Sequence, residues 1–273
     1  MIEFILMNEI DKLQIDRSII QHIKEGNTGK FEPRAGMDLI SFDLLNIDEP
    51  EKDTERIVIM QTNERVQFIA RNEYALDKIK SHTCECDKPD TVLYDFFSSL
   101  LKFDMDRMDD LEESITLMEN ALLSDTRNDY TIEIIGYRKK LLRLKKYYEQ
   151  LSQIFDGFIA NDNKLLPDDN VRVFGYLDKR ADQLLLHVNN LRDYITQVRE
   201  AWQAQIDIQQ NEIMKVFTVI AAIFLPLTLI VGWYGMNLIM PEIHWQYGYP
   251  FVIALSVAVV VVMIVYFKKK KWF

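Results

Sequence analysis

The stretch VFTVIAAIFLPLTLIVGWYGMN, residues 216 to 237, decides the fold of this 273-residue chain. It contains no charged residue, and as a helix its part up to Tyr234 would be roughly 30 Å long. A second uncharged run, GYPFVIALSVAVVVVMIVYF, covers residues 248 to 267. Both runs match the thickness of the hydrocarbon core of a bilayer. We therefore predict two transmembrane helices, since the cores of soluble proteins rarely need two such runs.

Charge divides the chain into two parts. Beyond Lys215 the charged residues are Glu242 and the four lysines at 268 to 271, which leaves a net charge of +3 there and −13 on residues 1 to 215, since the whole chain carries −10. Basic residues mark the cytoplasmic ends of membrane spans. We therefore predict cytoplasmic termini from Lys215 and from the four lysines, which belong to a basic tail at 268–273. The chain would then be a multi-pass protein of the cell (plasma or inner) membrane. The start of the chain does not resemble a signal peptide, which agrees with this orientation.

Residues 1–91 predict a small cytoplasmic α/β domain. The run RIVIMQTNERVQFIAR, residues 56 to 71, has the pattern of a β-hairpin that turns at residues 62 to 64. The run MDLISFDLLNI, residues 37 to 47, reads as another strand, and the surrounding stretches look helical.

Long helices are predicted from residue 92 onward. Residues 92–167 read as an antiparallel helical pair, 92–124 and 131–160. Because no glycine lies between Gly175 and Gly232 and no proline from 168 to 225, one helix could run from 168 to 234. It would comprise a stalk, 168–215, and the first span, 216–236, followed by an outer loop at 237–247. Six residues of the stalk form a heptad seam: Leu184, Val188, Leu191, Ile195, Val198 and Trp202.

A stripe of small and polar residues continues the spacing of three and four into the first span. Its members are Asn211, Met214, Thr218, Ala221, Leu225, Thr228, Gly232 and Gly235. Such residues line close helix contacts in membranes, so helix packing is one interpretation. The other is a water-filled pore, because the stripe starts below the membrane with an amide and ends above it near Asn237.

One chain with two spans cannot enclose a pore, but a ring of identical chains can. Each stripe position would then become a ring of neutral oxygens, which suits a cation that keeps its water, such as Mg²⁺. Glu242 would add an acidic ring at the outer entrance.

Other motifs are weaker. The CxC of Cys84 and Cys86 beside His82 has too few ligands for a structural zinc site and favours reduced thiols in a loop. The histidines at 22, 82, 187 and 244 are scattered, and neither a nucleophile motif nor a phosphate-binding GxxxxGK[ST] is present. We expect neither enzymatic activity nor a nucleotide or nucleic-acid partner.

The YGMN at 234 to 237, the MPE at 240 to 242, the two spans and the final KKKKWF closely resemble the CorA family of magnesium transporters. The resemblance is strongest over residues 205 to 273. It implies a funnel-shaped homopentameric channel in the lipid bilayer, with an α/β N-terminal domain, long helices and a two-helix transmembrane hairpin. It places Gly235, Met236 and Asn237 at a selectivity filter for hydrated Mg²⁺. It also makes Asn211, Met214, Thr218, Thr228 and Gly232 pore positions and puts Leu225 where a methionine is common.

The resemblance further implies that the channel closes when cytoplasmic Mg²⁺ binds acidic residues between subunits. One such position falls on Glu200, whereas an expected aspartate is replaced near Tyr176. Passive influx of Mg²⁺, with Co²⁺ and Ni²⁺ as further candidates, is the expected function. The alternatives are a zinc transporter of the same superfamily and a membrane-anchored coiled-coil scaffold.

Overall fold

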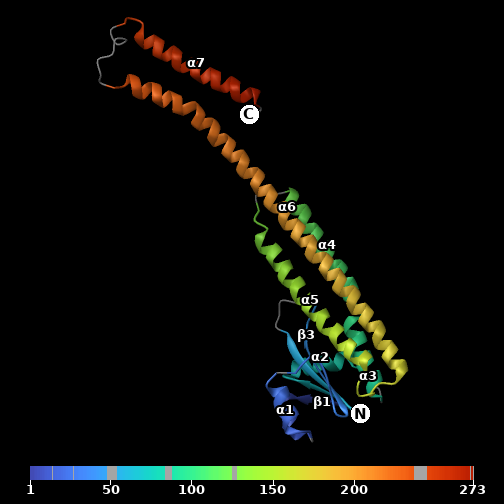
Figure 1. Cartoon of the computed structure of the whole chain (residues 1–273). Helices are drawn as coiled ribbons and strands as arrows, with labels where there is room; N and C mark the ends of the chain where they lie inside the picture. The colour runs from blue at the N-terminus through green and yellow to red at the C-terminus, as the bar shows by residue number, and fades with distance from the viewer. Residues whose placement is uncertain are drawn as a thin grey trace. The chain divides into compact units, whose positions relative to one another are not determined.

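The computed structural model describes residues 1–13, 15–26, 28–47, 54–83, 88–124, 128–236, 245–270 and 272. The chain forms two compact units, Met1–Arg199 and Glu200–Phe273. The first unit holds a β-sheet and a helical bundle (Figure 1). Its elements before the bundle are β1 (Ile2–Leu6), the 3-10 helix η1 (Met7–Lys12), α1 (Arg17–Lys24), β2 (Phe31–Arg34), β3 (Met37–Leu44), β4 (Glu55–Gln61), β5 (Val66–Ala70) and α2 (Glu73–His82).

The five strands form one sheet in the order β1-β5-β4-β3-β2. Strands β2 to β5 pair antiparallel in sequence order, and β1 pairs parallel with β5. The predicted hairpin at 56 to 71 is confirmed as β4 and β5, and the predicted strand at 37 to 47 as β3. The helical expectation for the surrounding stretches is wrong for β1 and β2, which are the two edge strands. An edge strand is stabilised by pairing with a single neighbouring strand. Its own sequence therefore has only a weak strand pattern.

Helices cover both faces of the sheet because alternate strand residues point to opposite sides. On one face, Leu39, Val58, Met60 and Ile69 form a buried cluster with residues of η1 and α1. On the other face, aromatic rings join the strands to the helices that follow, and the ring contacts are Phe42 with Phe97 at 5.8 Å, Phe68 with Phe96 at 5.1 Å, and Phe97 with Phe155 at 5.4 Å. The sheet is thereby attached to the bundle by buried rings.

The helix predicted at 92–124 is two helices, α3 (Pro89–Leu101) and α4 (Asp104–Ser124). Lys102 and Phe103 form the turn between them. The carbonyl of Lys102 accepts a hydrogen bond of 2.9 Å from Nη2 of Arg180, far along the chain. A tertiary contact therefore coincides with this break between α3 and α4. The sequence has no glycine or proline there that would predict it.

Three helices run side by side in the bundle: α4, α5 (Thr131–Ala160) and the first part of α6 (Asp168–Tyr234) (Figure 1). The predicted helix at 131–160 is confirmed, and so is the single 67-residue helix from 168 to 234. Ser152 of α5 donates to Asp178 of α6 at 3.2 Å. All six seam positions of α6 are buried: Leu184, Val188, Leu191, Ile195, Val198 and Trp202.

Close contacts lock α5 and the loop after it onto the sheet. A Cβ atom at Gly157 would lie 2.2 Å from Cγ of Phe31 in β2, so only glycine fits there. In the loop, Nδ2 of Asn163 donates to the carbonyls of Arg34 and Met37 at 2.7 and 2.9 Å and to Oδ1 of Asp38 at 2.7 Å. These contacts hold the β2–β3 turn against the end of α5.

Candidate functional site

The second unit contains the end of α6 and α7 (Gly248–Lys269), the two described helices that are long and apolar enough to cross a membrane. Only 6% of the residues in each apolar window are buried within the chain. The core helix of a soluble protein would bury most of such a window. These apolar side chains are therefore exposed to whatever surrounds the unit, and lipid is the environment that suits them.

The two sides of the first span differ in exposure. The stripe from Asn211 to Gly235 is exposed at each of its eight positions. The residues of the span that are at least partly covered lie, at roughly 100° per residue, on the nearly opposite side: 219, 222, 223, 226, 227, 230 and 234. Helix packing within this chain therefore does not account for the stripe, which is left open to a partner or to water.

The two threonines of the stripe present acceptor oxygens. The hydroxyl of Thr218 donates to the carbonyl of Met214 at 2.7 Å, and that of Thr228 donates to the carbonyl of Phe224 at 2.8 Å. A hydroxyl has one hydrogen and two lone pairs. Because the hydrogen is engaged by the helix in both cases, each oxygen offers its remaining lone-pair capacity to its surroundings. That arrangement suits a cation or the water bound to it.

The two glycines at the end of the span have different roles. Gly232 lies inside α6, and a Cβ atom there would meet nothing within 4 Å. Gly235 follows the last residue of α6, and its N–H donates to the carbonyl of Val231 at 2.8 Å. A Cβ atom at Gly235 would lie 2.8 Å from the same oxygen, so this close approach requires glycine. The helix predicted from 168 to 234 thus includes Gly232 and ends just before Gly235.

Several predicted site residues stand apart or lie beyond the described ranges. Met236 is exposed just after α6, while Asn237 and Glu242 lie outside the described residues. Glu200 is exposed on α6 and does not belong to the group of metal-ligating side chains found in the described ranges.

The interpretation of the CxC beside His82 as reduced thiols in a loop stays a prediction. Nδ1 of His82 lies 3.0 Å from the hydroxyl of Ser99, and burial lowers the pKa of this imidazole. Cys84 and Cys86 lie outside the described residues.

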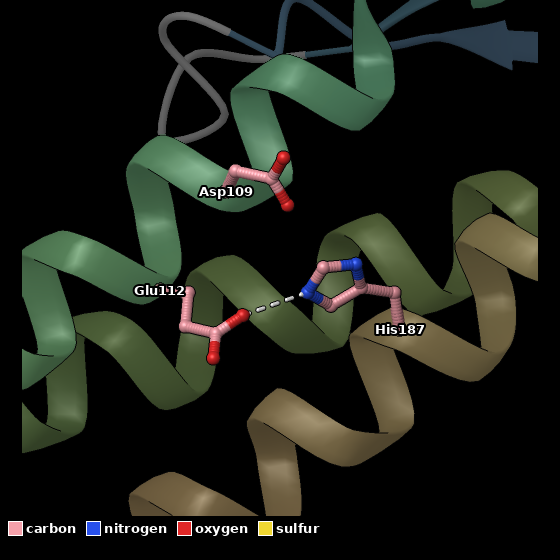
Figure 2. A group of neighbouring side chains, drawn as sticks. All are labelled: Asp109, Glu112 and His187. Atoms are coloured by element: carbon pink, nitrogen blue, oxygen red, sulfur yellow. Dashed lines mark hydrogen bonds and ion pairs between the residues drawn. The ribbon is translucent and has the colours of Figure 1, made fainter.

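One group of potential metal-ligating side chains was not predicted from the sequence. Asp109 and Glu112 on α4 approach His187 on α6, and their ligand atoms all lie within 4.8 Å of one another (Figure 2). Oε2 of Glu112 lies 3.1 Å from Nε2 of His187. In the sequence His187 is isolated, because Glu112 and Asp109 precede it by 75 or more residues and only the packing of α4 on α6 brings the three together.

An α/β domain continued by long helices into two exposed apolar helices defines a two-span membrane protein. The chain belongs to the CorA family, because the model of the CorA-like Mg²⁺ transporter protein family matches residues 7–269. The resemblance seen in the motifs is thereby confirmed.

Relatives with assigned names agree with this family. The "Cobalt/magnesium transport protein CorA" of Thermotoga maritima is 30% identical over 186 residues, which are 68% of this chain and 53% of that protein. The "Magnesium transport protein CorA" of Haemophilus influenzae is 25% identical over 258 residues, 91% of this chain and 81% of that one. The chain thus spans about half the length of the Thermotoga relative.

Solved structures show the same fold. The complete CorA magnesium transporter from Methanocaldococcus jannaschii matches with a TM-score of 0.78 at 20% identity, over 98% of this chain and 88% of that one. The full-length CmaX protein matches with a TM-score of 0.73 at 15% identity, over 97% and 85% of the two chains. The ZntB cytoplasmic domain from Vibrio parahaemolyticus matches less well, with a TM-score of 0.57 at 12% identity over 73% and 82%.

Proposed function

We propose that the chain forms a channel that conducts divalent cations, chiefly Mg²⁺, across the membrane. The observation that carries this proposal is the exposed stripe of α6, which the chain leaves uncovered along its whole described length. Family membership and the names of the relatives, which transport magnesium or cobalt, support the same cargo. Co²⁺ and Ni²⁺ are secondary candidates.

The stripe becomes a pore only in a ring of subunits. Two helices cannot surround a column of water, whereas a closed ring places the same residue of each chain around the axis. A homopentamer is the ring that the family resemblance implies. In it, Ala221 and Gly232 keep the pore wide, Leu225 forms an apolar constriction, and Thr218, Thr228 and Asn211 supply neutral oxygens.

Neutral oxygens favour an ion that crosses with its water. Mg²⁺ gives up its hydration shell reluctantly, so oxygens that accept hydrogen bonds from its bound water suit it better than a cage of carboxylates. We assign selection to the ring of Gly235, Met236 and Asn237 and an attracting role to Glu242. An inside-negative potential contributes about 2.3 kcal/mol per charge per 100 mV, twice that for a divalent ion, so influx needs no ATP.

Regulation by cytoplasmic Mg²⁺ is the finer part of the proposal. The net charge of −13 on residues 1 to 215, obtained from −10 for the whole chain and +3 beyond Lys215, attracts cations to this part. Glu200 is the carboxylate that we expect to bind Mg²⁺ between subunits. Mg²⁺ should therefore protect the cytoplasmic domain from protease in the wild type, and less so in Glu200→Gln. Protection that never changes with Mg²⁺ would rule out this form of regulation.

The decisive experiment measures Mg²⁺ influx into proteoliposomes that contain a Mg²⁺-sensitive dye. Wild type and Asn237→Ala are compared at equal reconstitution, and influx is expected to be lost in the variant. A competition series with Zn²⁺ follows. If the wild type passes Zn²⁺ but not Mg²⁺, the zinc-transporting alternative replaces the magnesium assignment. If it passes neither ion, the scaffold alternative, which needs only the buried seam of α6, is favoured.

A further inference from the structure

We propose that Asp109, Glu112 and His187 bind one divalent transition-metal ion, such as Zn²⁺, Co²⁺ or Ni²⁺, within a single chain. Asp109 and Glu112 are three residues apart on α4 and so lie one turn apart on the same face of that helix. His187 approaches them from α6 (Figure 2). The site goes beyond the proposed transport, because it uses residues outside the stripe and needs no ring of subunits.

The distances suit a small metal ion. Zinc lies about 2.0–2.2 Å from nitrogen and carboxylate ligands, so two neighbouring ligand atoms are roughly 2.8 to 3.6 Å apart in octahedral or tetrahedral sites. Oε2 of Glu112 and Nε2 of His187 are 3.1 Å apart, within that range. Asp109 is exposed, and its ligand atom lies within 4.8 Å of the other two, so a rotation of its side chain completes the triad.

A surface hollow of about 310 Å³ adjoins the site and gives room for water to fill the remaining coordination positions. Glu112 and His187 line this hollow together with Gln183, Asn190 and Tyr194, which offer polar groups to such waters. Tyr194 already donates to Glu119 at 2.5 Å, which orders this side of the hollow. The side chain of His187 is only 21% exposed, so its ring is held in place by the packing of α4 on α6.

The ligand set selects the kind of metal. Imidazole suits Zn²⁺, Co²⁺ and Ni²⁺, whereas Mg²⁺ prefers oxygen ligands and keeps several waters. One imidazole with two carboxylates should therefore bind a transition metal in the presence of excess Mg²⁺. The bound ion would join α4 to α6 and stabilise the bundle against local opening.

The chain supplies a matched control. His22 of α1 pairs with Glu32 of β2, with Nε2 and Oε1 3.3 Å apart. In the described residues this pair is not part of a three-ligand group. The metal site therefore depends on the third ligand and on the geometry, whereas an ordinary histidine–carboxylate pair should not retain the ion.

The test measures Zn²⁺ binding to the purified full-length protein in detergent by equilibrium dialysis at neutral pH with millimolar Mg²⁺. Cys84 and Cys86 are changed to serine throughout, so that thiolates do not contribute. We expect His187→Gln, which keeps a hydrogen-bond donor near Glu112, to lose one bound Zn²⁺ per chain. Asp109→Asn and Glu112→Gln should weaken binding by at least about tenfold. His22→Gln should bind as the parent does.

Hydrogen exchange provides the second measurement. Zn²⁺ should slow exchange in α4 and in the part of α6 around His187 in the parent and leave His187→Gln unchanged. The proposal is overturned if His187→Gln binds Zn²⁺ as the parent does, or if His22→Gln loses the same ion. Mg²⁺ influx measured on the same variants tests transport separately, since failure of Zn²⁺ binding leaves the pore untouched.

Discussion

Tyr148 of α5 donates a hydrogen bond of 3.2 Å to Oδ2 of Asp104, a fully buried carboxylate at the first residue of α4. Nη1 of Arg107 lies 3.4 Å from the other carboxylate oxygen. Burial raises the pKa of Asp104 to about 6, and the contacts with Tyr148 and Arg107 only partly oppose that rise. A buried, incompletely compensated carboxylate thus lies at the start of α4, against α5.

Asp104→Asn should stabilise the protein at neutral pH. Because the pKa of Asp104 is higher in the folded than in the unfolded state, the folded state binds the proton more tightly between about pH 4 and pH 6. Stability therefore falls as pH rises through this window and stays lower above it. A rise of about two units corresponds to at most about 3 kcal/mol. Urea unfolding followed by far-UV circular dichroism should show the variant about 1–3 kcal/mol more stable at pH 7.5, with little difference near pH 4. A variant that is less stable than the wild type at pH 7.5 would contradict the argument that burying the charged carboxylate of Asp104 lowers the free energy of unfolding.

Gly157→Ala should destabilise the first unit. The added methyl would overlap the ring of Phe31, and overpacking of this kind costs about 1–3 kcal/mol. Gly136 is the matched control in the same helix, because a Cβ atom there meets nothing within 4 Å. Gly136→Ala should gain about 0.5–1 kcal/mol from helix propensity. Thermal unfolding of the two variants should therefore shift in opposite directions, and equal shifts would refute the argument from packing.

Asn163→Ala should loosen the β2–β3 turn. It removes three hydrogen bonds and leaves the buried carboxylate of Asp38, whose pKa burial already raises, without its amide partner. The expected loss is about 1–3 kcal/mol. Asn163→Asp should be worse at neutral pH, because it places a like charge beside Asp38. Hydrogen exchange in residues 31 to 44 is the measurement, and unchanged protection in both variants would show that Asn163 is dispensable.

The hydroxyls of Thr218 and Thr228 should matter to ion flux. Replacing both by valine keeps their shape and removes two acceptor oxygens from the stripe. We expect Mg²⁺ influx to fall about tenfold, which corresponds to about 1.4 kcal/mol. Ser256→Ala in α7 is the control, since that hydroxyl makes the same bond to its helix, 2.8 Å to the carbonyl of Val252, but lies outside the stripe. Equal loss in the control would mean that the hydroxyls act on helix stability rather than on the ion.

The sequence predicted the features that repeat along the chain. The 67-residue helix, the hairpin at 56 to 71 and the two spans all have a regular period or a long uncharged run, so local patterns reveal them. The stripe was visible for the same reason, and the structure adds that it lies opposite the covered side of α6.

The features that the sequence did not predict depend on contacts between distant residues. The break at Lys102 and Phe103 coincides with a hydrogen bond from Arg180. Asp104 lies among several other acidic residues in the sequence, yet it is fully buried against Tyr148. The triad around His187 exists only because α4 packs on α6. Local periodicity contains no information about such pairs.

The parallel pairing of β1 with β5 has a consequence for the order in which the chain matures on the ribosome. Ile2 faces Val66 in the register, so among the described strands β1 pairs with β5 alone, the strand of the sheet that comes last along the chain. Closing a loop of that length costs entropy that grows only slowly with length, but the pairing cannot begin until β5 has left the exit tunnel. Strand β1 can therefore join the sheet only after β5 has been made, whereas β3 and β4 can pair before that point.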